Sequence, residues 1–272
     1  MQFLDQAAAT IDAFRLRALN RQGKPLRVKV DGNTYYLNPE STALYHARQS
    51  MPKLVRMVEL IGDATTIFDV GANCGIFAAL CARKFPTATI HVFEPAKTLQ
   101  SILALNCSAP NISVHELAVG DQNDLLTLYV HPDSQQANSL RLSAVEPFLH
   151  GTEFKTETIR CVTLDSFAAE HGVPPIDVLK VDVQGLEGAV LRGAQSSLKS
   201  VQYLFLEVTW LDLEGVQRIL PAAEHYGFRY VAVVNEVYTG ADLLFTREPL
   251  NAKVPNVLRF PLGAESAGQP WF

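Results

Sequence analysis

The stretch Thr66-Ile67-Phe68-Asp69-Val70-Gly71-Ala72-Asn73-Cys74-Gly75-Ile76-Phe77 decides the fold of this chain. It begins as a short apolar run of strand type, breaks at two glycines and continues as an apolar helical segment to residue 83. A strand that enters a helix through a glycine turn exposes backbone N–H groups at the helix start and lets a ligand come close to the main chain. The stretch therefore predicts a site for a nucleotide-like ligand.

The spacing of the two glycines narrows this prediction. Gly71 and Gly75 form G-x-x-x-G, which is neither the G-x-G-x-x-G of a dinucleotide fold nor the G-x-x-x-x-G-K-[ST] of a phosphate loop. A second strand, predicted at 89–94, ends in Glu94, 23 positions after Gly71. A carboxylate at this place is suited to accept hydrogen bonds from the two ribose hydroxyls of an adenosine. An adenosine without phosphate indicates S-adenosylmethionine.

At these residues the chain resembles the class I S-adenosylmethionine-dependent methyltransferases, and more narrowly the FkbM family. The resemblance covers roughly half of the chain, from Ile67 to Glu207. The family usually has Glu where this chain has Gln184. Five motifs in the family's order carry the resemblance: Phe68-Asp69-Val70-Gly71-Ala72-Asn73-Cys74-Gly75, Val92-Phe93-Glu94-Pro95, Ala118-Val119-Gly120-Asp121, Val162-Thr163-Leu164-Asp165 and Ile176-Asp177-Val178-Leu179-Lys180-Val181-Asp182-Val183-Gln184-Gly185-Leu186-Glu187.

The composition indicates a globular protein. The 272 residues, 48% of them hydrophobic, suffice for one α/β domain with an appendage or for two small domains. A net charge of −5 gives no broad basic surface, so no nucleic-acid partner is expected. The four cysteines lack metal-binding spacing, so no metal is predicted, although ligands from separate strands would escape this test. Without a leader-like start or a run of about 18 apolar residues, no membrane contact and a cytoplasmic location are expected.

From Thr66 onward strands and helices alternate. This pattern predicts a Rossmann-like α/β fold, a mostly parallel seven-stranded sheet with helices on both faces. The resemblance implies that the last strand is antiparallel. Extra strands at 125–130 and 158–163 predict a β insertion, and the polar stretch between them is expected to cover the active site. The seven main strands are predicted at 66–70, 89–94, 112–117, 176–182, 201–208, 228–234 and 242–246.

Residues 1–62 are predicted to form an N-terminal extension to a methyltransferase domain at 63–272. Residues 3–19 have the period of an amphipathic helix, and 26–30 and 34–37 flank the D-G turn of a predicted hairpin. A second helix is expected from 39 to about 61, interrupted at Pro52. A lid over the acceptor and a packing or homodimer contact explain this extension equally well.

Cofactor-binding positions follow from the motifs. Asp69, at the end of the first strand, is expected to meet the methionine amino group directly or through water, and Glu94, followed by Pro95, to bind the ribose. The alternatives without ligand binding are that Asp69 caps a helix and that Glu94 is a solvated residue at a strand end. The resemblance implies that Ala118 and Val119 flank the adenine. The turn itself consists of Gly71, Ala72, Asn73 and Gly75.

Four charged residues are candidates for the chemistry. Methyl transfer to a hydroxyl needs an in-line nucleophile and a route for its proton. Lys180 and Asp182, two apart at a strand end, share one face, so Asp182 is expected to point at the methyl group or the substrate. Glu207 ends a nearly apolar strand and is the other candidate for base or substrate orientation. Glu187 begins a helix, where a carboxylate equally serves the helix dipole.

The expected activity is S-adenosylmethionine-dependent O-methylation of a small molecule. The resemblance implies a sugar, a polyketide or another secondary metabolite as acceptor. N-methylation of an amino sugar or related amine and a non-catalytic cofactor-binding subunit are the alternatives, whereas the missing third glycine disfavours a nicotinamide dehydrogenase. Candidate acceptor-binding residues are His131, Asn138, Ser139 and Gln184.

Overall fold

The main sheet of the molecule has a Rossmann-like arrangement of strands. The computed structural model describes residues 18–19, 22, 24–30, 32–39, 43–130, 138, 140, 155–209, 213–237, 240–250 and 258–261. Within these ranges the main sheet has eight strands in the order β13-β11-β12-β10-β9-β3-β4-β5. Their bounds are β3 (Thr66–Val70), β4 (Thr89–Phe93), β5 (Ile112–His115), β9 (Val178–Val181), β10 (Tyr203–Thr209), β11 (Tyr230–Val237), β12 (Gly240–Thr246) and β13 (Leu258–Pro261).

The sheet confirms the predicted fold class and corrects the number of strands. All seven predicted strands are present, and neighbours from β10 through β9, β3 and β4 to β5 are parallel. β12 is antiparallel to both β10 and β11, as the resemblance implied. The eighth strand, β13, pairs with β11 at the sheet edge. It has only four residues and ends in Pro261, and a proline in so short a run argues against a predicted strand.

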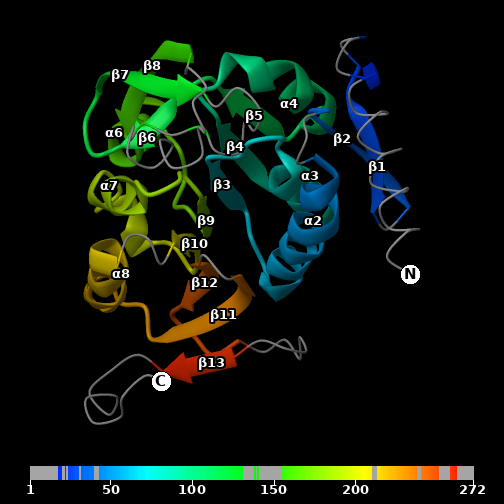
Figure 1. Cartoon of the computed structure of the whole chain (residues 1–272). Coiled ribbons are helices and arrows are strands. Elements are labelled where there is room, and N and C mark those ends of the chain that lie inside the picture. The colour runs from blue at the N-terminus through cyan, green and yellow to red at the C-terminus, as the bar shows by residue number, and fades with distance from the viewer. Residues whose placement is uncertain are drawn as a thin grey trace.

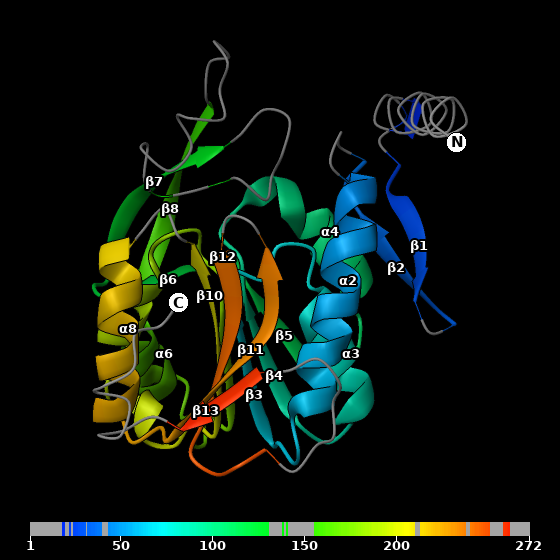
Figure 2. The same cartoon turned by 60° about the horizontal axis from the view of Figure 1, so that its bottom comes forward.

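Helices cover both faces of this sheet (Figures 1 and 2). α2 (Ala43–Leu60), α3 (Ile76–Lys84) and α4 (Gln100–Asn106) lie on one face, and α6 (Leu164–Glu170), α7 (Glu187–Arg192) and α8 (Leu213–His225) on the other. Consecutive residues of β3 serve the two faces, because Ile67 packs into the core beneath α3 and Phe68 into the core beneath α6. A strand buried on both faces explains the unbroken apolar run in the sequence. Short 3-10 turns occupy η1 (Lys97–Leu99) and η4 (Ser197–Lys199).

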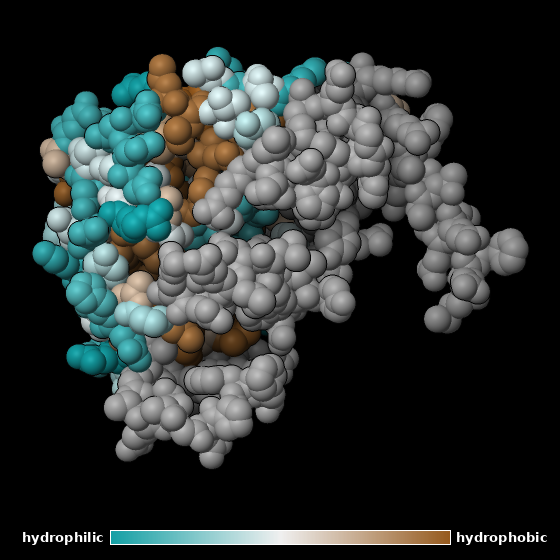
Figure 3. Space-filling model, turned by 60° about the vertical axis from the view of Figure 1, so that its left-hand side comes forward, coloured by the Kyte–Doolittle hydropathy of each residue, from teal (hydrophilic) through white to brown (hydrophobic). Residues whose placement is uncertain are grey.

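Figure 3 shows the side of α6, α7 and α8, where, among the described residues, hydrophobic residues gather in patches between hydrophilic ones. All four cysteines are buried, and none of them forms a disulfide. In the described part of the chain, no helix is both long and apolar enough to span a bilayer.

The predicted β insertion forms a separate small sheet. Its order is β6-β8-β7, with β6 (Ala118–Gly120) parallel and β7 (Asp124–Val130) antiparallel to β8 (Lys155–Thr163). Most of the polar stretch between β7 and β8 lies outside the described residues. Its role as a cover therefore stays a prediction.

The N-terminal segment contains the predicted hairpin, β1 (Leu26–Val30) and β2 (Asn33–Leu37). The predicted interruption at Pro52 is wrong, because α2 continues through this residue. A proline inside a helix costs about 3 kcal/mol, and the burial of Met51, Met57 and Leu60 against the rest of the core offsets this cost. Of the predicted helix at 3–19, only residues 18 and 19 are described, and both are helical.

Asn106, at the end of α4, connects the hairpin to the glycine turn. Its side-chain amide donates to the carbonyl oxygens of Tyr36 (2.8 Å) and Cys74 (2.7 Å), and its oxygen accepts from the Tyr36 N–H (2.9 Å). One side chain thus satisfies three backbone groups from two distant segments. This contact fixes the N-terminal hairpin beside the turn.

Asn106→Ala should destabilise the fold and loosen the hairpin. Leaving these polar groups unpaired costs about 1 to 3 kcal/mol of the free energy of unfolding, measured by urea denaturation. Hydrogen exchange at the Tyr36 amide should accelerate. Asn111→Ala is the matched control, since Asn111 donates to the carbonyl oxygens of Phe85 (3.4 Å) and Ala88 (2.9 Å), neither of which belongs to the hairpin. Unchanged exchange at Tyr36 in Asn106→Ala would refute the connection.

Candidate active site

The glycine turn after β3 lies between the ends of β4 and β9. Gly71 and Gly75 have φ of 71° and 72°, and Asn73 between them has φ of 52°. The N–H groups of Gly71 and Ala72 donate to the Phe93 carbonyl (3.0 and 3.1 Å). A Cβ on Gly71 would lie 1.9 Å from the carbonyl oxygen of Asp182. The turn therefore requires glycine at Gly71 for both conformation and space.

Glu94 is buried and braces this turn. Its carboxylate accepts hydrogen bonds from the N–H groups of Asn73 (2.9 Å) and Ala96 (3.0 Å), with the half-buried Pro95 between Glu94 and Ala96. Burial raises the pKa of Glu94 to about 7, although both N–H groups oppose this rise. The side chain is 7% exposed, so the alternative of a solvated strand end is wrong.

Asp69 and Lys180 form a buried ion pair beneath the turn. Lys180 Nζ lies 3.0 Å from Asp69 Oδ1 and donates to the Gly71 carbonyl at 3.3 Å. Burial raises the pKa of Asp69, and Lys180 opposes that rise. Burial alone would lower the pKa of Lys180, but Asp69 and Asp182 raise it, so the lysine is charged. Asp69 Oδ2 has no hydrogen-bond partner of ordinary geometry among the described residues.

Asp182 and Glu207 come together at the ends of β9 and β10. The Gln184 amide nitrogen joins them, donating to Asp182 Oδ1 at 3.0 Å and to Glu207 Oε2 at 2.8 Å. Gln184 adopts a left-handed conformation, φ 55°, which turns its side chain toward the two acids. Each carboxyl side chain is 24% exposed, against 0% for Asp69 and 6% for Lys180. A second molecule can therefore reach Asp182 and Glu207.

The two carboxyl groups titrate in opposite directions. Burial raises the pKa of Glu207 well above its usual range, and the neighbouring Asp182 charge raises it further. Burial alone would raise the pKa of Asp182 too, but Lys180 and a hydrogen bond with Glu207 hold it below its usual value. Burial thus favours the protonated form of Glu207, whereas Lys180 favours the ionised form of Asp182.

Sequence reasoning missed three residues that continue this row. Glu207 of β10, Asp242 of β12 and Asn235 of β11 are neighbours in register. Lys53 from α2 lies 2.9 Å from Asp242 Oδ1 and 3.5 Å from Glu207 Oε1, and Asn235 donates to Asp242 Oδ2 (3.1 Å). An acid in the apolar run Ala241-Asp242-Leu243-Leu244 was a usable signal for Asp242. No pattern in the sequence pointed to Lys53.

Glu187 braces the loop that follows Asp182. Its carboxylate accepts from the N–H groups of Val183 (3.1 Å) and Gly185 (3.2 Å to one oxygen, 3.1 Å to the other). Burial raises the pKa of Glu187 to about 7, against the effect of these N–H groups. Through these contacts Glu187 stabilises the loop beside Asp182 and Glu207.

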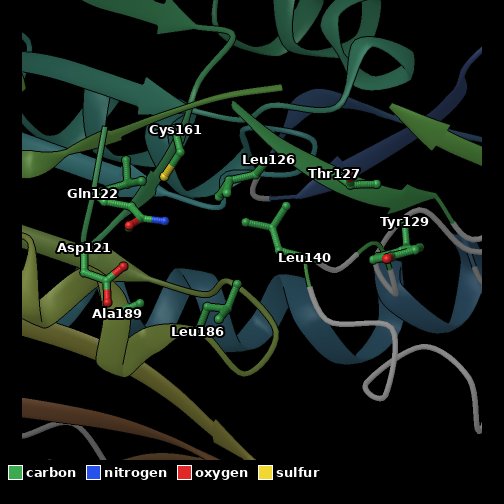
Figure 4. Close-up of a pocket in the computed structure, with 11 residues that line it drawn as sticks. Asp121, Gln122, Leu126, Thr127, Tyr129, Leu140, Cys161, Leu186 and Ala189 are labelled. Atoms are coloured by element: carbon green, nitrogen blue, oxygen red, sulfur yellow. The ribbon is translucent and has the colours of Figure 1, made fainter. Parts of the chain in front are cut away.

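A cavity of about 240 Å³ lies between the small sheet and α7 (Figure 4). Leu126, Leu140 and Leu186 reach it from three separate segments, and Asp121 and Gln122 lie at one end. Val119 and Gly120 also line it, whereas Ala118 is a buried core residue beside them. Val119, one of the two residues expected at the adenine, therefore borders this cavity, and Ala118 does not line it.

The remaining predicted positions divide into described and undescribed ones. Ala72 is 7% exposed within the turn, and Asn138 is half-buried. His131 and Ser139 lie outside the described residues, so their roles stay predictions. Across the described ranges, no group of three or more His, Cys, Asp or Glu side chains has the arrangement of a metal site.

Comparison with known proteins supplies the family. Residues 69–230 match the model of the methyltransferase FkbM domain. The chain is 27% identical over 206 residues to the 31-O-demethyl-FK506 methyltransferase FkbM of Streptomyces tacrolimicus, covering 65% of this chain and 77% of that protein. It is 27% identical over 169 residues to the hexuronic acid methyltransferase AglP of Haloferax volcanii, covering 62% and 66%.

Among solved structures, the methyltransferase FkbM of Methylobacillus flagellatus aligns with a TM-score of 0.45 at 14% identity, over 74% of this chain and 60% of that one. The family match begins at Asp69 and includes the glycine turn, Glu94 and the acidic pair. It extends over more than half of the 272 residues. The chain belongs to the FkbM family of S-adenosylmethionine-dependent methyltransferases.

Proposed function

We propose that this chain transfers a methyl group from S-adenosylmethionine to a hydroxyl oxygen of a sugar or polyketide-like small molecule. The observation that carries the proposal is the pair of Asp182 and Glu207, joined by the Gln184 amide and partly exposed beside the glycine turn. The names of two relatives, a 31-O-demethyl-FK506 methyltransferase and a hexuronic acid methyltransferase, support this acceptor class. A hydroxyl acceptor needs a group that takes its proton, and an ionised carboxylate is such a group.

The residues present suit the cofactor. Asp69 Oδ2, which accepts no hydrogen bond of ordinary geometry among the described residues, is proposed to meet the methionine ammonium group through water, because the side chain is 0% exposed. Gly71 leaves the space that a Cβ would fill, and Glu94 is a carboxylate for the ribose hydroxyls. The cavity beside Val119 is the place proposed for the adenine. When bound, S-adenosylmethionine supplies a methyl group activated on a sulfonium.

Asp182 and Glu207 have different roles at the acceptor in this proposal. Asp182 is ionised and accepts the proton of the acceptor hydroxyl as the oxygen attacks. The raised pKa of Glu207 favours its protonated form, which can donate a hydrogen bond that orients the acceptor or Asp182 itself. Gln184 holds the two groups at a fixed separation, a task that suits an amide because a Glu there would add a third carboxyl group. Lys180 fixes Asp69 and the turn, and Glu187 fixes the loop.

Calorimetric titration with S-adenosylhomocysteine, with NAD and adenosine as controls, is the first test. Micromolar, selective binding is expected. Monosaccharides, uronic acids and hydroxylated macrolides are then offered with S-adenosylmethionine, and products are analysed by mass spectrometry for one added methyl group. Methylation at oxygen supports the proposal. Binding without transfer to any hydroxyl, together with transfer to amines, would overturn it.

Glu94→Gln should weaken S-adenosylhomocysteine binding by about 1 to 3 kcal/mol, since a carboxylate is exchanged for a group that accepts weaker hydrogen bonds. The ionised form of Glu94 binds ribose hydroxyls best, and its pKa is about 7. Wild-type affinity should therefore rise as pH increases through about 7, and Glu94→Gln should lose this rise. Calorimetry on both sides of neutral pH measures the effect. If the two proteins bound S-adenosylhomocysteine equally at every pH, Glu94 would not contact the ribose and would only stabilise the turn.

A further inference from the structure

Lys53 places a positive charge against two carboxyl groups of the sheet. Its Nζ lies 2.9 Å from Asp242 and 3.5 Å from Glu207, and its side chain is 12% exposed. Burial disfavours its charge, but Glu207, Asp242 and Asp182 outweigh this and raise its pKa. Lys53 is therefore charged throughout the physiological range.

Lys53 comes from outside the part of the chain that matches the family. That match covers residues 69–230, whereas Lys53 belongs to α2 and its partner Asp242 to β12. One turn further along α2, Arg56 donates to the Val234 carbonyl of β11 at 2.9 Å. This bond anchors the helix to the sheet and holds Lys53 over the strand ends.

The part of the site around Asp182 and Glu207, where the acceptor is proposed to bind, contains more acidic than basic side chains. The ionisable groups that face Glu207 in the described residues are Asp182 at the end of β9, Asp242 of β12 and Lys53 of α2. Asp182 in addition faces Lys180, which Asp69 already engages. Among the described residues, Lys53 thus faces three carboxyl groups and no other ionisable partner. Removing that lysine changes the charge balance of the whole row.

We propose that Lys53 is a positioning residue of the active site, whose ammonium group between Glu207 and Asp242 favours the ionised forms of Glu207 and Asp182. The role of Asp182 as base rests on the proposed function. The control of charge by Lys53 depends only on contacts within this chain.

The sign of the effect differs between two variants. Lys53→Met removes a positive charge, so the pKa values of Glu207 and Asp182 should both rise. Asp242→Asn removes a negative charge from the same cluster, so the pKa of Glu207 should fall. A charge at this distance shifts a titration midpoint by about one pH unit or more, which is about tenfold in proton affinity. Lys53→Arg keeps the charge and should leave both midpoints in place.

Carbon-13 NMR of protein labelled at Asp and Glu side-chain carboxyls follows these titrations without an acceptor. Signals are assigned with Asp182→Asn and Glu207→Gln. Arg56→Met is the matched control, because it removes a tie between the same helix and the sheet without changing a charge in the cluster. A purely structural role for Lys53 predicts that Lys53→Met and Arg56→Met act alike.

Midpoints that move upward in Lys53→Met and downward in Asp242→Asn, and stay in place in Arg56→Met, support the proposal. Unchanged midpoints, or movement in the same direction in both charge variants, overturn it. Lys53→Gln takes the place of Lys53→Met if that variant does not fold, because it removes the same charge and keeps a polar side chain. Titration with S-adenosylhomocysteine on the same proteins keeps the two ideas apart, since failure to bind it bears on the methyltransferase function and leaves the carboxyl midpoints interpretable.

Discussion

Replacing Asp182 with Asn should lower kcat about 10²- to 10⁴-fold, the range for loss of a general base, while S-adenosylhomocysteine affinity changes little. Asn matches Asp in shape, and the backbone bond from the Asp182 N–H to the Val70 carbonyl (3.0 Å) remains. Only the group that accepts the proton is lost. Rates of methyl transfer to the acceptor found by screening, with calorimetry on the same protein, measure the two effects separately.

Glu207→Gln is the companion variant for Asp182. Burial raises the pKa of Glu207 and so favours its protonated form; a glutamine keeps the capacity of that form to donate, so kcat should fall much less than in Asp182→Asn. Equal losses in the two variants would show that the carboxyl groups act as an undivided pair. An equal loss of turnover and cofactor affinity in Asp182→Asn would instead make Asp182 part of the cofactor pocket or the fold.

Gly71→Ala should cost about 2 to 5 kcal/mol of the free energy of unfolding, the sum of left-handed strain and overpacking. The added Cβ would lie 1.9 Å from the carbonyl oxygen of Asp182 and 2.8 Å from its carbonyl carbon. Backbone atoms cannot give way as a flexible side chain can, so the turn must separate from the end of β9. S-adenosylhomocysteine affinity should fall at least about tenfold, or 1.4 kcal/mol.

Gly172→Ala is the control that separates the two contributions. Gly172 also has positive φ, 59°, but a Cβ there would meet nothing within 4 Å. It should lose only the conformational part, about 1 to 2 kcal/mol, and bind S-adenosylhomocysteine normally. Urea denaturation and calorimetry on both variants test the comparison. Similar losses of stability in the two would show that the contact with Asp182 is unimportant.

The sequence predicted the parts of the fold that depend on local pattern. The glycine turn, the strand that ends in Glu94 and the alternation of strands and helices each leave a signal within about thirty residues. Asp182 and Glu207 were identifiable because acids at the ends of apolar strands are unusual. The sequence also showed that this chain has Gln184 where the family usually has Glu. In the structure the Gln184 amide lies between Asp182 and Glu207 and donates to both.

What the sequence could not predict depends on contacts between distant segments. Lys53 and Glu207 are 154 positions apart, and only the packing of α2 on the sheet brings them together. Asp242 and Asn235 join the row through the register of β10, β12 and β11. The helix through Pro52 was mispredicted for the same reason, because burial against the core outweighs a local preference. Local periodicity contains no information on such pairings.

The bonds of Asn106 make the position of the N-terminal hairpin and the shape of the glycine turn thermodynamically linked. The same side chain holds Tyr36 of β2 and the carbonyl of Cys74 inside the turn. Any cofactor that orders the turn must therefore tighten the hairpin by the same free energy with which the hairpin, once in place, strengthens cofactor binding. A change in the stability of the hairpin should thus change cofactor affinity, and cofactor binding should change the stability of the hairpin, although the two are far apart in the sequence.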